Sequence, residues 1–309
     1  MRILYAGTEE IAVPTLEALA AAKLVVAVLT TPDEPGKRGK TLLPSPVKQA
    51  AVRLGLPVLQ CDHLGSEARK LVSAYAPDTL MSFCYGRIFG PKFLALFSRR
   101  FNIHPSLLPK YRGCAPIQAA ILSLDRQTGI SIQDIAPGID EGDLYLTQSF
   151  SLDGSETSAT LCDRVSRLAS SLAVDLLGGL DVFRPRAQEG EASYTRMIAK
   201  DDGRLDFSWS AARLHATVRA YSTWPKAWCL LCGQRLLVTG VDGSAFDIAD
   251  GECQEEPGTI VALDKAHGLK VATGSGYLHI TRLQLPTKKE MDSQSFVNGQ
   301  RGIIGKRLE

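Results

Sequence analysis

The chain has 309 residues, of which 45% are hydrophobic and 22% are charged. This balance is typical of a globular protein and excludes an intrinsically disordered one, and the length is comfortable for two domains. The formal net charge of +2 is close to neutral. Charge alone therefore neither requires nor excludes a nucleic-acid partner.

Membrane segments, signal peptides and disulfide frameworks are not expected. No stretch approaches the roughly 18 uninterrupted apolar residues of a membrane span, and residues 1–7 lead directly into strand-like sequence. The seven cysteines are odd in number and scattered, which predicts reduced thiols in a cytoplasmic protein. Cys229 and Cys232 have the spacing of half a zinc site, but no second ligand pair completes it, so we expect no metal.

The first half of the chain alternates short apolar runs with amphipathic segments. Strands are expected at residues 3–6, 24–29, 58–59, 79–83, 101–103 and 130–135. Helices are expected between them, and Ser45-Pro46 opens one with a cap residue followed by proline. This alternation predicts an α/β domain with an open, mostly parallel, Rossmann-like sheet that is covered on both faces.

A longer helix and a linker follow. The apolar positions of the helix recur at helical spacing and predict one buried stripe: Leu161, Val165, Leu168, Leu172 and Leu176. Gly178-Gly179 ends the helix. From residue 184 to about 203 the sequence is polar and weakly periodic, which is typical of a linker. We place the catalytic domain at 1–189 and the linker at 190–204.

Strands dominate the last part of the chain. A helix is expected at 211–221, and five short strands are expected at 228–231, 235–239, 258–262, 270–272 and 277–285. This pattern predicts a smaller, OB-like β-barrel domain at 205–309. Such barrels often bind nucleic acid through a basic face, for which the candidates are Lys270, Arg282, Lys288 and Lys289.

The residues with the clearest chemistry lie at the strand expected at 101–103. Asn102 and His104 share one face of this strand because side chains alternate. Pro105 cannot continue a central strand, so the pair lies at its carboxyl end, where open α/β sheets bind ligands. Asp140 lies in a glycine-rich loop after the strand expected at 130–135, where a carboxylate can approach a ligand. Taken alone, these polar residues could also be structural.

Together, these residues resemble the formyltransferases that use 10-formyltetrahydrofolate. The match consists of Asn102-x-His104, the following Ser106-Leu107-Leu108-Pro109, and Asp140 in an Asp-x-Gly loop, and Tyr85-Gly86 is similar to the pterin-side loop. The similarity extends over essentially the whole chain. It implies a catalytic triad of Asn102, His104 and Asp140, with the folate cosubstrate contacted by Ser106, Leu107, Leu108, Pro109, Tyr85 and Gly86.

Residues 32–46 resemble the basic, glycine-rich loop with which some members of this family contact the acceptor stem of methionyl-tRNA. Lys37, Arg38 and Lys40 would follow its phosphates. The resemblance therefore implies formyl transfer to the α-amine of methionyl-initiator tRNA, by a protein that is a monomer by default. It also implies that Asn102 and a His104 kept charged by Asp140 stabilise the oxyanion.

Three departures from the family pattern are Glu9, Ile11 and Gly90, near the expected methionine and pterin pockets.

Three alternative functions stay open. The triad is shared by formyltransferases that act on sugar or nucleotide amines, but the basic loop and the second domain argue against these acceptors. A formyltetrahydrofolate hydrolase would use the same triad with water as nucleophile. A catalytically silent nucleic-acid-binding protein would not need all three triad residues.

Overall fold

The computed structural model describes residues 1–36, 42–300 and 302–309. The residues predicted to contact tRNA, Lys37, Arg38 and Lys40, lie outside this part of the chain.

The chain divides into two compact units that interleave along the sequence. The first comprises Met1–Gly113, Gly129–Ser149 and Cys162–Tyr194, and the second comprises Cys114–Thr128, Phe150–Leu161 and Thr195–Glu309. The division at 1–189, 190–204 and 205–309 runs in chain order and does not represent this interleaving. It stays a prediction.

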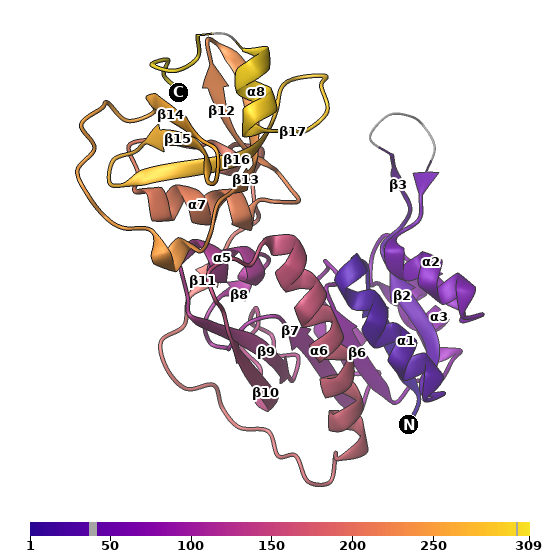
Figure 1. The fold of residues 1–309 in the computed structure, drawn as a ribbon. Helices are drawn as coiled ribbons and strands as arrows, with labels where there is room; N and C mark the ends of the chain where they lie inside the picture. The colour runs from indigo at the N-terminus through magenta and orange to yellow at the C-terminus, as the bar shows by residue number, and fades with distance from the viewer. Residues whose placement is uncertain (37–41, 301) are drawn as a thin grey trace. The chain divides into compact units, whose positions relative to one another are not determined.

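Seven strands of the described chain form the first sheet (Figure 1). Its order is β10-β9-β7-β6-β1-β2-β5. The strands are β1 (Ile3–Gly7), β2 (Val25–Thr30), β5 (Val58–Gln60), β6 (Thr79–Phe83), β7 (Arg99–His104), β9 (Gln127–Gln133) and β10 (Leu144–Ser151). Neighbours from β5 to β7 pair in parallel, whereas β9 is antiparallel to β7. The predicted mostly parallel sheet is confirmed, and its order reverses beside β1, where such sheets bind ligands.

Helices cover both faces of this sheet. They are α1 (Val13–Ala21), α2 (Pro46–Arg53), α3 (Ser66–Ser73), α4 (Pro91–Leu94) and α6 (Ser158–Gly178), with the 3₁₀ turn η1 (Glu10–Ala12). The helix α5 (Pro116–Leu122) belongs to the second unit. Leu4 and Ala6 of β1 share a buried cluster with Phe93 of α4. Tyr5 points to the opposite face because strand residues alternate, and its hydroxyl donates to the Ala12 carbonyl at 2.6 Å, just before α1.

Local sequence signals located two helix ends correctly. The Ser45 hydroxyl accepts from the Lys48 N–H at 3.0 Å and caps α2, as predicted. Helix α6 ends at Gly178, and Leu161, Val165, Leu172 and Leu176 of its predicted stripe are buried.

Strand β10 was not predicted. Four short strands add local pairing: β3 (Glu34–Pro35), β4 (Leu42–Leu43), β8 (Arg112–Gly113) and β11 (Tyr194–Thr195).

The second unit contains an antiparallel sheet of the order β12-β13-β16-β15-β14, with β17 beside β16. The strands are β12 (Ala227–Leu231), β13 (Gln234–Val241), β14 (Ile260–Asp264), β15 (Gly268–Ala272), β16 (Tyr277–Gln284) and β17 (Met291–Asp292). The helical segments are η2 (Lys200–Gly203), α7 (Ala211–Ala220), η3 (Ala245–Asp247) and α8 (Ser293–Gly299). Leu214 of α7 and Phe296 of α8 enter its buried core.

Residues 305–309 connect the two edges of this sheet. Glu309 exchanges backbone hydrogen bonds of 2.7 and 2.9 Å with Leu230 of β12. Next to it, the Leu308 N–H donates to the Gly258 carbonyl at 2.9 Å, and the Ile260 N–H of β14 donates to the Lys306 carbonyl at 2.8 Å. The segment thus closes the sheet, which confirms the small β-barrel predicted here.

Candidate active site

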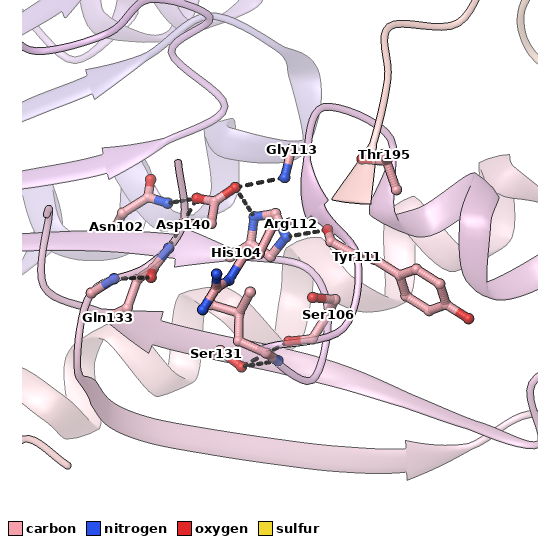
Figure 2. Close-up of polar contacts among 12 residues, drawn as sticks. Asn102, His104, Ser106, Tyr111, Arg112, Gly113, Ser131, Gln133, Asp140 and Thr195 are labelled. Atoms are coloured by element: carbon pink, nitrogen blue, oxygen red, sulfur yellow. Dashed lines mark hydrogen bonds and ion pairs between the residues drawn. The ribbon is translucent and has the colours of Figure 1, made fainter. Parts of the chain in front are cut away.

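The three side chains of the predicted triad meet at the carboxyl end of β7 (Figure 2). Asn102 and His104 come from β7, and Asp140 comes from the loop between β9 and β10. The Asn102 Nδ2 donates to Asp140 Oδ1 at 3.2 Å. The His104 Nδ1 lies 3.5 Å from Asp140 Oδ2. An amide, an imidazole and a carboxylate are therefore held in one cluster.

Hydrogen bonds hold the Asp140 carboxylate on both oxygens. Oδ2 accepts from the Gly113 N–H at 2.8 Å, and Oδ1 accepts from Gln133 Nε2 at 2.9 Å in addition to Asn102. The side chain is 13% exposed. Since a buried carboxylate is costly without partners, these three donors explain how Asp140 can lie against His104.

His104 is buried, with 4% of its surface exposed. Its Nε2 lies 2.9 Å from the Tyr111 carbonyl oxygen. A carbonyl can only accept, so Nε2 carries a proton, and in the neutral imidazole the Nδ1 lone pair then faces Asp140. Burial lowers the pKa of His104, and the Asp140 carboxylate and the Tyr111 carbonyl oppose that shift. Burial thus favours the neutral imidazole and the carboxylate favours the charged one, and the expectation that Asp140 keeps His104 charged stays a prediction.

Comparison with known proteins identifies the family. Residues 1–177 match the family described as Formyl transferase, and residues 197–301 match its C-terminal domain. The chain belongs to the formyl transferase family. This formyl transferase is 40% identical to the methionyl-tRNA formyltransferase of Methylococcus capsulatus, over 100% of the chain and 99% of the relative. It is 38% identical to that of Ectopseudomonas mendocina, over 97% and 95%.

Solved structures share the fold of this formyl transferase. The methionyl-tRNA formyltransferase from Clostridium thermocellum has a TM-score of 0.58 at 16% identity, over 79% of this chain and 94% of that one. HypX from Aquifex aeolicus in complex with tetrahydrofolic acid has a TM-score of 0.62 at 16% identity, over 98% and 48%. At such low identity these likenesses concern the fold alone.

The segment expected to contact folate forms the turn after β7 in this formyl transferase. The Ser106 hydroxyl donates to the Lys110 carbonyl at 2.6 Å. The Ser131 hydroxyl donates to the Ser106 carbonyl at 2.8 Å and accepts from the Leu108 N–H at 3.1 Å. The Leu108–Pro109 peptide bond is cis. The Ser106 side chain therefore stabilises the turn. The neighbouring Leu107 side chain is partly exposed.

Tyr85 and Gly86 follow β6, the strand beside β7. The Tyr85 side chain is 2% exposed and stacks on Phe89 with 5.3 Å between ring centroids. Its carbonyl accepts from the Thr8 hydroxyl at 2.9 Å, which ties this turn to the end of β1. Gly86 has φ of +83° and open space where a Cβ would lie. The turn therefore presents its backbone, while the Tyr85 ring packs in the core.

Three polar residues of the site were not predicted. Gln133 lies opposite Asn102 in the β7–β9 pair, and it could have been noticed as a polar residue at the end of an apolar strand. Arg112 and Gln188 also join the cluster through hydrogen bonds of 2.8 and 3.2 Å to each other. Gln188 lies in the polar run at 184–203, where no pattern distinguishes it.

The described part of the chain shows neither a cluster of metal ligands nor a helix that could span a membrane. No group of three or more His, Cys, Asp or Glu side chains in residues 1–36, 42–300 and 302–309 is arranged to hold a metal ion. Within the same residues, none of the helices has the length and apolar character needed to cross a membrane.

Proposed function

We propose that this protein transfers the formyl group of 10-formyltetrahydrofolate to the α-amino group of methionyl-initiator tRNA, giving N-formylmethionyl-tRNA for translation initiation. Its relatives of 38–40% identity, which match over almost their whole length, are named methionyl-tRNA formyltransferases. The observation that carries the chemistry is the Asn102, His104 and Asp140 cluster at the carboxyl end of β7.

We assign the proton transfer to His104. The reaction forms a bond between the amine nitrogen and the formyl carbon and breaks the bond from that carbon to N10, while one proton moves from the amine to N10. The Nε2 proton is held by the Tyr111 carbonyl, so Nδ1 is the nitrogen that exchanges its proton. A neutral imidazole takes the proton of the attacking amine there and delivers it to N10.

Asn102 and Asp140 stabilise the charges that develop. Asn102 Nδ2 has two hydrogens and uses one for Asp140, so the second is available to the formyl oxygen as it becomes an oxyanion. Loss of one such donor typically costs about 10²–10³ in rate. The Asp140 carboxylate, 3.5 Å from Nδ1, stabilises the imidazolium that forms during transfer.

The folate cosubstrate is assigned to the turns that flank this cluster. Tyr85 and Gly86 contribute backbone atoms, because the Tyr85 ring is buried and the space beside Gly86 is open. Ser106, Leu107, Leu108 and Pro109 form the second turn, and the Ser106 hydroxyl is occupied within it. Backbone donors and acceptors suit the polar edge of a pterin ring.

The tRNA is assigned to two regions. Lys37, Arg38 and Lys40 contact acceptor-stem phosphates from the loop of the catalytic domain at 1–189. Beyond the linker at 190–204, the domain at 205–309 supplies further contacts, for which Lys288 and Lys289 are exposed. Arg282 is partly neutralised by Glu290, and Lys270 lies 3.8 Å from the Tyr277 ring centroid. The protein acts as a cytoplasmic monomer.

Purified protein, 10-formyltetrahydrofolate and methionyl-initiator tRNA test the proposal, with N-formylmethionine measured after hydrolysis of the product. We expect formylation that is lost in His104→Ala and retained in His63→Ala, which removes an exposed histidine. Formate release without tRNA would identify a hydrolase. Formylation of an amino-sugar nucleotide instead of the tRNA would identify a sugar formyltransferase.

A further inference from the structure

Residues 186–188 run alongside the loop that carries Asp140. Arg186 exchanges two backbone hydrogen bonds with Leu144, of 2.7 and 3.0 Å, at the start of β10. Two residues later, the Gln188 side chain turns toward the loop. Its Nε2 lies 2.8 Å from both the Asp140 and the Gly142 carbonyl oxygens. One side-chain amide therefore donates to two backbone carbonyls of the loop, which are two residues apart.

The other end of the Gln188 amide is fixed by Arg112. The Gln188 Oε1 accepts from Arg112 Nη2 at 2.8 Å and from its Nε at 3.2 Å. Arg112 is 12% exposed and also lies 3.2 Å from Glu141 Oε1. A guanidinium can only donate, so it holds the Gln188 oxygen on its own side and directs both amide hydrogens toward the loop.

The Asp140 loop needs such support because its backbone is constrained. Asp140 has φ of +54°, in the left-handed region that persists only when the surroundings hold it. A Cβ at Gly142 would lie 1.8 Å from the Asp134 carbonyl oxygen, so the chain passes very close to itself. Carbonyls turned inward in a loop this tight need donors from elsewhere, and Gln188 supplies them.

Gln133 links this backbone contact to the carboxylate itself. It is 1% exposed. Its Nε2 donates to Asp140 Oδ1 at 2.9 Å, and its Oε1 accepts from the Gly142 N–H at 3.1 Å and from Gln188 Nε2 at 3.2 Å. Movement of Gln188 would therefore disturb both the loop and one acceptor oxygen of the triad.

We infer that Gln188 is a positioning residue for formyl transfer, whose donated hydrogen bonds hold the Asp140 loop so that the carboxylate stays against His104 and Asn102. Arg112 orients the Gln188 amide for this task. The inference rests on the proposed function, and it adds a residue that touches no reacting atom but determines where Asp140 lies.

Two substitutions distinguish the role of the hydrogen bonds that the Gln188 amide donates from the role of those that its oxygen accepts. Gln188→Glu keeps the size and an acceptor oxygen for Arg112 Nε and Nη2, but it places a second carboxylate oxygen against the two loop carbonyls. Gln188→Met keeps the length and removes all polar contacts. Gln294→Ala is the control, because Gln294 is exposed in α8 and its Nε2 donates to Asn298 Oδ1 at 3.1 Å.

For both Gln188 variants we expect kcat for methionyl-tRNA formylation to fall about 10- to 100-fold, the range that misplacement by about 1 Å produces. KM for tRNA and folate should stay within about twofold, and Gln294→Ala should match the wild type. In Gln188→Met the pH midpoint of kcat should move lower, because the carboxylate that raises the His104 pKa has moved away. A wild-type kcat in Gln188→Glu would show that Gln188 merely anchors Arg112 and would overturn the inference, as would a change confined to melting temperature or KM.

The titration of the His104 imidazole by NMR, in substrate-free protein, separates this inference from the proposed function. Absence of formylation by the wild type would refute the function alone. A His104 midpoint that is the same in the wild type and in folded Gln188→Met would refute the positioning role, whatever the acceptor. If Gln188→Met does not fold, Gln188→Glu takes its place, and an unchanged midpoint in that variant refutes the role.

Discussion

Replacing Asp140 with asparagine removes one negative charge from the site and keeps its shape. The charge lies 3.5 Å from His104 Nδ1. At an effective dielectric constant of about 20, a pair of unit charges at this distance is worth about 5 kcal/mol. The imidazolium that forms during transfer loses this stabilisation, which corresponds to at least about 10³-fold in rate.

The hydrogen bonds determine how the asparagine side chain is oriented. Oδ1 accepts from Asn102 and Gln133, so the new nitrogen takes the other position, where it loses the Gly113 N–H and donates to the His104 Nδ1 lone pair. The lost negative charge and the hydrogen bond donated to Nδ1 both lower the pKa of His104. The hydrogen bond also occupies the lone pair that would accept the proton of the amine. We therefore expect Asp140→Asn to lower kcat about 10³-fold with the folate KM little changed.

Single-turnover formylation of methionyl-tRNA at saturating folate measures this loss directly. The pH midpoint of the rate should also move lower than in the wild type, because the carboxylate that raises the His104 pKa is gone. Gln294→Ala controls for general effects of substitution. A folded Asp140→Asn protein within tenfold of the wild-type rate, or one with only a raised KM, would refute the electrostatic role of Asp140.

Three further predictions concern other parts of the chain. Arg38→Ala should raise KM for tRNA and lower the slope of log KM against log salt by about one unit, with folate binding unchanged; equal slopes would argue against phosphate contact. Gly142→Ala should reduce formylation at least tenfold (about 1.4 kcal/mol) and lower the melting temperature, because its Cβ would lie 1.8 Å from the Asp134 carbonyl, whereas Gly178→Ala has open space and should do neither. Burial, aided by Arg219, lowers the pKa of His215 to about 4, so the free energy of unfolding should fall by up to about 3 kcal/mol between pH 6.5 and 4; a urea titration in which His215→Gln keeps the same pH slope would contradict this.

The sequence carried the elements of the fold because their signals are local. Short apolar runs between amphipathic segments located the parallel strands. The Ser45 cap located the start of α2, and Gly178 located the end of α6. The pairing of Asn102 with His104 was also accessible, because alternate residues of β7 share one face. The contact with Asp140 was not, because β9 is antiparallel to β7 and the loop after β9 turns back to reach His104. Strand β10 was missed because its exposed positions are mostly polar and break the apolar pattern.

Features that depend on long-range backbone positions could not be predicted. The Tyr111 carbonyl, which decides which nitrogen of His104 carries the proton, is a main-chain atom with no sequence signature. Gln188 contacts a loop 48 residues away through a side chain that any polar linker could contain. Burial of the Tyr85 ring and of His104 depends on packing, so the opposition between burial and the Asp140 carboxylate at His104 had no signal in the sequence.

The segment that closes the second sheet has a consequence for how this protein is made. Translation delivers residues 305–309 after every strand from β12 to β16, so the nascent sheet first exists with two open edges. Leu230 on one edge and Gly258 and Ile260 on the other then have no backbone partners from this segment, and such edges pair readily with those of neighbouring chains. A chain in which residues 305–309 are not yet paired therefore exposes both edges, and the pairing of this segment is the step that protects the sheet from association with neighbouring chains.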